Sequence, residues 1–147
     1  VTEIKEIMAK DLQNTILNPI SCSGIGIHSG KKVNMKLCPA SEDNGITFIR
    51  SDFDNKERSE IKADYKNVTQ TNLGTNIENE FGAKVCTVEH LLSGIWGAKI
   101  DNLIIEIDNE ELPIFDGSSE PFIFLTECAG IKKQEKQRKY IHILNSV

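Results

Sequence analysis

Two adjacent residues in the middle of the chain carry side chains suited to metal-assisted hydrolysis. Glu89 and His90 lie at the start of a segment whose apolar residues recur with helical spacing. A neutral imidazole binds Zn²⁺, and a carboxylate beside it can take a proton from metal-bound water. Taken alone, such a pair is more often a solvent-facing or hydrogen-bonded pair on a helix, so the motif needs support from other residues.

The segment that holds this pair is predicted to be a helix that begins at Thr87, a good N-cap residue, and ends at Gly97. Its apolar stripe consists of Val88, Leu91, Leu92, Ile95 and Trp96. The opposite face holds His90, Ser93, Gly94 and Gly97. A solvated helix face would be rich in Lys and Glu. We therefore expect another surface to approach this face closely.

Two further residues are candidates for the same chemistry. His28 lies in the glycine-rich turn Gly24–Gly30, where glycines allow a ligand to come close; the alternative is an exposed histidine in a hairpin turn. Asp116 is either an Asx-turn residue or a site residue. A catalytic zinc needs three protein ligands, and the remaining histidine, His142, is interpreted as structural. From the residues alone, an enzyme and a binding module are nearly equal alternatives.

The remaining pattern predicts an α+β sandwich, with helices on one face of a mainly antiparallel sheet. Strand character extends over 13–39, and 46–50 is expected to be the next strand of a hairpin after the turn Asp43-Asn44-Gly45. Residues 51–60 are interpreted as a loop, and 61–77 as two short strands around a turn near Leu73-Gly74. A strand is expected at 103–107, and a second helix from Ser118-Ser119 to Gly130 with Pro121 in its first turn.

Composition excludes several classes of protein. A chain of 147 residues with 39% hydrophobic residues suits one globular domain, and no apolar run approaches the roughly 20 residues of a membrane span. The net charge of −5 argues against a nucleic-acid partner. Residues 1–11 lack the apolar region of a secretory signal. Four widely spaced cysteines are expected to be reduced thiols in the cytoplasm, with two disulfides as the alternative.

One cluster of charged residues, 132–139 (KKQEKQRK), follows Gly130 and precedes the apolar-rich stretch 140–144. A solvated linker is the favoured interpretation. The alternative is a basic patch that touches an anionic substrate or makes peripheral contact with a membrane surface.

Four segments in order resemble one family of enzymes. SGIGIHSGKKV (23–33), CTVEHLLSGIWG (86–97), IDNLIIEID (100–108) and LPIFDGSSEPFI (112–123) are similar to the UDP-3-O-acyl-N-acetylglucosamine deacetylases, zinc hydrolases of lipid A synthesis. The resemblance spans roughly residues 13–143. It implies a two-layer βααβ sandwich, one of two such domains, with the active site between their helix layers.

The resemblance also implies roles for individual residues. Glu89 corresponds to the family's catalytic base and His90 to one of its zinc ligands, while Fe²⁺ would suit a His-His-Asp site about as well. His28 corresponds to a histidine near the metal that can help to bind a second, inhibitory ion. Thr71, Asn72 and Leu73 fall in the region that lines the passage for an acylated UDP-sugar substrate. The turn Asp116-Gly117-Ser118 matches a motif that looks structural.

The chain departs from the family in one respect. The family's other two zinc ligands come from an H-x-x-x-D motif in the second domain, as does its general-acid histidine, and this sequence has no such motif. Residues 1–138 are thus expected to be the N-terminal domain and 139–147 the start of the missing C-terminal domain. The leading hypothesis is the N-terminal half of the deacetylase, inactive alone. The alternative is a split or degenerate, non-catalytic domain that docks to a partner or binds a sugar nucleotide.

Overall fold

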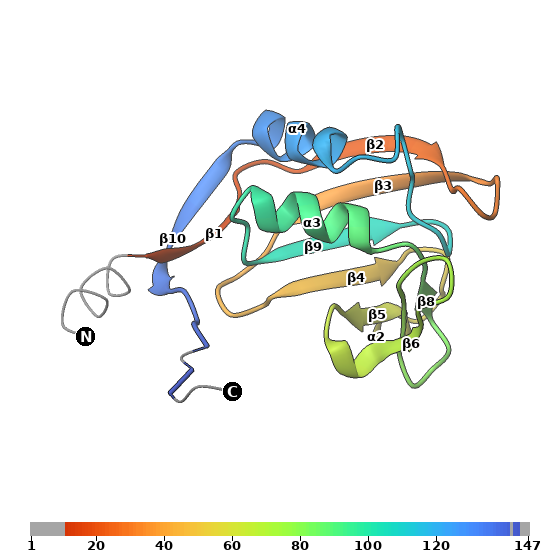
Figure 1. Cartoon of the computed structure of the whole chain (residues 1–147), viewed down its shortest axis with the longest axis horizontal. Helices are drawn as coiled ribbons and strands as arrows, with labels where there is room; N and C mark the ends of the chain where they lie inside the picture. The colour runs from red at the N-terminus through yellow and green to blue at the C-terminus, as the bar shows by residue number, and fades with distance from the viewer. Residues whose placement is uncertain (1–10, 142, 145–147) are drawn as a thin grey trace.

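The computed structural model of the chain describes residues 11–141, 143 and 144 (Figure 1). Two helices, α3 (Glu89–Gly97) and α4 (Glu120–Ala129), lie against each other on one face of a five-stranded sheet. This arrangement confirms the predicted α+β sandwich. No helix among the described residues is long and apolar enough to cross a membrane.

The main sheet contains β2 (Ile20–Ile25), β3 (Lys32–Pro39), β9 (Leu103–Ile107), β4 (Ile46–Arg50) and β5 (Glu60–Lys62), in that order. Strand β9 pairs antiparallel with β3 and parallel with β4. The predicted hairpin of β3 and β4 is therefore wrong. The apolar strand β9 lies between them, where neighbouring strands and the helix layer cover it most fully.

A two-stranded ribbon at one end of the molecule corrects the interpretation of the charged cluster. Strand β10 (Ile131–Gln137) pairs antiparallel with β1 (Leu12–Ile16). The linker predicted at 132–139 is thus a strand over most of its length. Its side chains are mostly exposed, so its composition resembles that of a linker although its backbone is paired. Past the strand, Arg138 binds Asp101 and the Tyr140 hydroxyl donates to Asp11. The domain division at residue 138 stays a prediction.

At the other end, three short strands form a third sheet of β6 (Val68–Gln70), β7 (Asn76–Glu78) and β8 (Lys84–Val85). The predicted turn near Leu73-Gly74 joins β6 to β7, while β8 was not predicted. The loop predicted at 51–60 is wrong in part, because it contains the helix α2 (Lys56–Ser59) and the first residue of β5. Asn55 caps α2 by accepting the N–H groups of Glu57 and Arg58. A 3₁₀ turn, Tyr65–Asn67, precedes β6.

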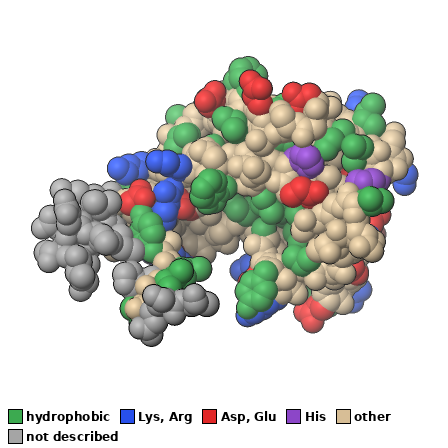
Figure 2. Space-filling view, in the orientation of Figure 1, with side chains coloured by type: hydrophobic (Ala, Val, Ile, Leu, Met, Phe, Trp, Pro, Cys, Tyr) green, Lys and Arg blue, Asp and Glu red, His purple; other side chains and the backbone are tan. Residues whose placement is uncertain are grey.

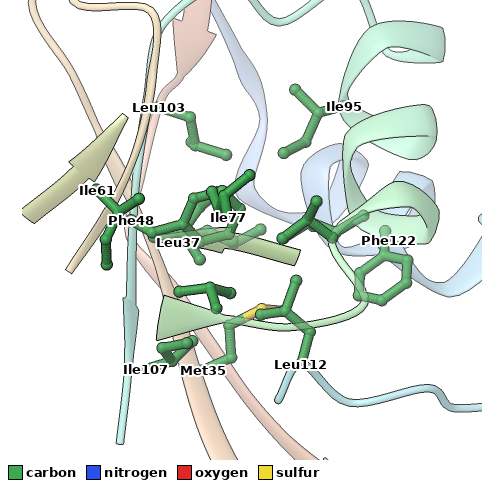
Figure 3. Packing of buried hydrophobic residues seen from close by; sticks show 14 of the residues in the cluster. Met35, Leu37, Phe48, Ile61, Ile77, Ile95, Leu103, Ile107, Leu112 and Phe122 are labelled. Carbon is green, nitrogen blue, oxygen red and sulfur yellow. The ribbon is translucent and has the colours of Figure 1, made fainter. Parts of the chain in front are cut away.

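The core lies between the main sheet and the helices (Figure 3). Three residues of the predicted stripe on α3 are buried, namely Val88, Leu91 and Ile95. Trp96 is 84% exposed, so its place in the stripe was wrong. It follows Ile95 by about 100° around the helix axis, which turns its ring away from the sheet. Helix α4 buries Phe122 and Ala129 and ends at Gly130, as predicted.

Part of the small-sided face of α3 is covered by α4. A Cβ atom on Gly94 would lie 2.9 Å from Cβ of Phe122 and 3.1 Å from the carbonyl oxygen of Ser119. The surface that approaches Gly94 therefore belongs to the same chain. His90 is half-buried and Ser93 is exposed.

All four cysteines are free thiols. Burial raises the pKa of the Cys22 thiol to about 11, so it remains protonated at neutral pH and packs as a small apolar group.

The close contact between α3 and α4 at Gly94 leads to a testable prediction about the stability of the fold. The variant Gly94→Ala should lower the free energy of unfolding by about 1–3 kcal/mol, because its Cβ overpacks the α3–α4 contact. Gly97→Ala is the matched control, since its Cβ would meet only Cδ1 of Ile123 at an ordinary 3.8 Å. Urea unfolding measures both, and a Gly94→Ala variant as stable as the unmodified chain would contradict the prediction.

Candidate active site

Glu89 and His90 are the first two residues of α3, and the chain reaches them through a sharp backbone turn. Thr87 has φ of 60°, a left-handed conformation that a β-branched residue rarely adopts. It is not the N-cap as predicted; Val88 takes that position without a side-chain hydrogen bond. The Thr87 hydroxyl instead donates to Oε1 of Glu111 at 3.2 Å. The turn thus uses Thr87 to connect the helix start to a neighbouring loop.

The Glu89 carboxylate is held in place by the loop between β6 and β7. Its Oε2 accepts the N–H of Thr75 at 2.9 Å. A Cβ atom on Gly74 would lie 3.5 Å from Oε1 of Glu89, 3.5 Å from Oγ1 of Thr87 and 3.8 Å from Cε1 of His28. The structure therefore brings His28 and Glu89 close to the same side of Gly74, where its Cβ would lie, although they are distant in sequence. Figure 2 shows histidine side chains near acidic ones on this face, at the end away from the termini.

A catalytic zinc ion needs three protein ligands. His90 is half-buried beside Glu89, and a neutral imidazole suits Zn²⁺ as a ligand. Among residues 11–141, 143 and 144, however, no group of three His, Cys, Asp or Glu side chains is close enough to hold a metal ion. His28, His90 and a carboxylate do not form such a group. The described residues therefore hold no complete metal site.

A pocket of about 350 Å³ opens beside Gly74 and includes His28 in its wall. Its lining from the β6–β7 loop includes Gln70, Asn72, Leu73 and Gly74. Of the three residues assigned to the substrate passage, Asn72 and Leu73 line this pocket, whereas Thr71 is exposed and is not part of the lining. Leu73 is 87% exposed, with φ of 62°. An apolar side chain so exposed is available for contact with a ligand.

Glu111 was not identified from the sequence. Its carboxylate forms hydrogen bonds with His28, Ser29 and Thr87. Its Oε1 accepts the N–H of His28 at 3.0 Å and lies 2.8 Å from Nδ1 of the same residue. Its Oε2 accepts the N–H of Ser29 at 2.7 Å. A Cβ atom on Gly26 would lie 2.3 Å from Oε2, so only glycine leaves room for the carboxylate there.

Glu111 is ionised in spite of its burial. Its side chain is only 5% exposed, and burial opposes the charged form. The hydrogen bonds from Ser29 and His28 together outweigh that penalty and lower the pKa of Glu111 to about 2. The neighbouring Glu110 is exposed. In the sequence the two are adjacent and chemically identical, and no local signal distinguishes the buried carboxylate from the exposed one.

Asp116 is not part of the pocket lining. Asp116 accepts both the N–H and the hydroxyl of Ser118 through Oδ1, each at 2.9 Å, and these bonds lower its pKa. That geometry is the Asx turn of the structural interpretation. His142 lies outside the described residues.

The depressed pKa of Glu111 predicts how stability depends on pH. A shift from 4.5 to about 2 stabilises the fold above pH 5. The contribution, about 3 kcal/mol, is lost as the pH falls from about 4.5 through 2. The stability difference between the unmodified chain and Glu111→Gln should therefore shrink between pH 6 and pH 3 in urea unfolding. A constant difference over that range would contradict the prediction, and Glu110→Gln serves as the control.

Comparison with known proteins places the chain among deacetylases. Residues 13–147 match the family model of UDP-3-O-acyl N-acetylglycosamine deacetylase. UDP-3-O-acyl-N-acetylglucosamine deacetylase from Syntrophus aciditrophicus is 44% identical over 135 residues, which are 92% of this chain and 42% of that protein. The proteins of the same name from Xanthomonas oryzae pv. oryzae and Xanthomonas euvesicatoria are each 46% identical, over 92% of this chain and 44% of their own length.

The chain therefore spans less than half the length of these relatives and corresponds to their N-terminal part. These matches confirm the resemblance inferred from the four motifs. The chain belongs to the UDP-3-O-acyl-N-acetylglucosamine deacetylase family.

Proposed function

We propose that this chain supplies the general base and one metal ligand to a deacetylase that removes the N-acetyl group from UDP-3-O-acyl-N-acetylglucosamine. The observation that carries the proposal is the position of Glu89, which is hydrogen-bonded at the helix start beside His90 and lies close to His28 on the same side of Gly74. We take an acylated UDP-sugar as the substrate because the relatives are named UDP-3-O-acyl-N-acetylglucosamine deacetylase. The soluble, cytoplasmic setting expected from the sequence belongs to the same proposal.

Glu89 is suited to accept a proton from water. One of its oxygens is occupied by the N–H of Thr75, which fixes the carboxylate and leaves Oε1 on the side of Gly74. A base held in one orientation before the substrate arrives loses little entropy in the transition state. Because Gly74 has no side chain, a water molecule and the acetamide group can approach this oxygen closely.

His90 would hold a metal ion by its imidazole, with zinc expected and Fe²⁺ an alternative. When bound, such an ion polarises an amide carbonyl and lowers the pKa of bound water. The described residues contain no complete metal-binding group, so the remaining ligands are assigned to an H-x-x-x-D motif outside this chain. We place the substrate in the pocket beside Gly74, with Asn72 and Leu73 in its wall; Thr71 is not part of the lining.

The role of Glu89 can be tested in the full-length protein. Replacing Glu89 with Gln keeps the size of the side chain but removes its basicity, so kcat should fall by about 10²–10⁴-fold with little change in thermal stability. Glu57→Gln on the exposed side of α2 is the matched control and should leave kcat unchanged. Turnover of the Glu89→Gln variant close to that of the unmodified enzyme would remove Glu89 from this role.

The incomplete donor set predicts weak metal binding by the 147-residue chain itself. Calorimetric titration with zinc chloride should give a binding free energy well below the roughly 10 kcal/mol or more of complete structural zinc sites. Tight 1:1 binding that is lost in His90→Ala would show that this chain alone completes the site, contrary to the proposal. His28→Ala distinguishes a site at His28 from one at His90.

A further inference from the structure

We propose that Glu111 is a positioning residue for His28: it holds the ring with the proton on Nδ1 and presents Nε2 to the pocket beside Gly74. The importance of this orientation for turnover rests on the proposed function. The orientation itself does not, because it follows from contacts within the described chain.

The hydrogen-bond partners of Glu111 determine the direction of its bond to the ring. Two backbone N–H groups, of His28 and Ser29, reach its two oxygens at 3.0 and 2.7 Å, and such groups can only donate. The Thr87 hydroxyl also donates to Oε1. A carboxylate that receives these donors is an acceptor, so the 2.8 Å contact with Nδ1 needs a proton on the ring nitrogen. In a neutral ring, Nε2 then carries the free lone pair.

The carboxylate that orients the ring is itself held rigidly. Its side chain is 5% exposed, whereas that of His28 is 47% exposed. Glu111 bridges the glycine-rich turn and Thr87, and its backbone forms an isolated β-bridge with Cys86. Gly26 makes room for Oε2 where any side chain would collide. A buried, multiply bonded group that holds a half-exposed ring is the arrangement expected of a positioning residue.

The orientation matters because the Glu89 carboxylate and the His28 ring lie close to the same point beside Gly74. The ring carbon Cε1, which joins the two nitrogens, is 3.8 Å from the position a Gly74 Cβ would occupy, and Oε1 of Glu89 is 3.5 Å from that same position. With Nδ1 fixed by Glu111, His28 offers Nε2 as a hydrogen-bond acceptor, or as a ligand, to a polar group bound in the pocket.

The test is a long-range ¹H–¹⁵N correlation spectrum of the ¹⁵N-histidine-labelled 147-residue chain at pH 8, which reports directly which ring nitrogen is protonated. The His28 signals are assigned by their loss in His28→Gln. We expect Nδ1 of His28 to be protonated in the unmodified chain. In Glu111→Gln the ring should lose this preference, and Nε2–H should increase toward the proportion in a free histidine. In Glu110→Gln, the matched control, the spectrum should not change.

Two results would overturn the inference. The first is an unprotonated Nδ1 in the unmodified chain, a measurement that needs no variant and stands even if Glu111→Gln fails to fold. The second is an unchanged His28 spectrum in a folded Glu111→Gln variant. Neither result depends on turnover, so failure of this inference is distinguishable from failure of the proposed deacetylase role, which the kcat of Glu89→Gln decides.

Discussion

Burial of β9 at the centre of the main sheet is the constraint that places most of the other elements. Its inward side chains, Leu103, Ile105 and Ile107, are almost fully buried beneath the helix layer. Each contributes about 1.5–3 kcal/mol relative to an exposed position. Because β9 occupies the space between β3 and β4, those strands cannot form a hairpin. The chain leaves β9 at Ile107 and reaches Glu111 four residues later. The position of the central strand therefore also determines where the Glu111 carboxylate lies.

The elements that could be predicted are those whose signals are local. Helix α4 has Pro121 in its first turn and Gly130 at its end, and the stripe of α3 packs against the sheet at Leu91 and Ile95. The order of the strands and the pairing of β10 with β1 depend on contacts between distant residues. A strand with exposed, charged side chains such as β10 leaves no apolar periodicity to detect. Local patterns therefore predicted the layers but not the sheet order.

The candidate site also contains residues that the local sequence identifies and one that it does not. Glu89, His90 and His28 were visible in the sequence because their neighbours are unusual, either glycine-rich or small-sided. Glu111 was not, because its burial comes from a turn more than eighty residues earlier in the chain. The need for glycine at position 26 also becomes clear only when the Glu111 carboxylate is in place. The residues proposed to do chemistry leave a local pattern here, whereas Glu111, which holds the His28 ring, is defined by the tertiary structure.

The strained and charged groups at this end of the molecule depend on the rigidity of the rest. The left-handed backbone of Thr87 costs about 1–3 kcal/mol, and such strain persists only where the surrounding structure overdetermines it. The hydrogen bond from Thr87 to Glu111, the packing of Val88 and the bond from Thr75 to Glu89 provide that support. Because these contacts lie within one chain, the carboxylate of Glu89 and the ring of His28 are oriented before any ligand binds. Under the proposed function, a second set of metal ligands would meet side chains that are already ordered, which lowers the entropic cost of completing the site.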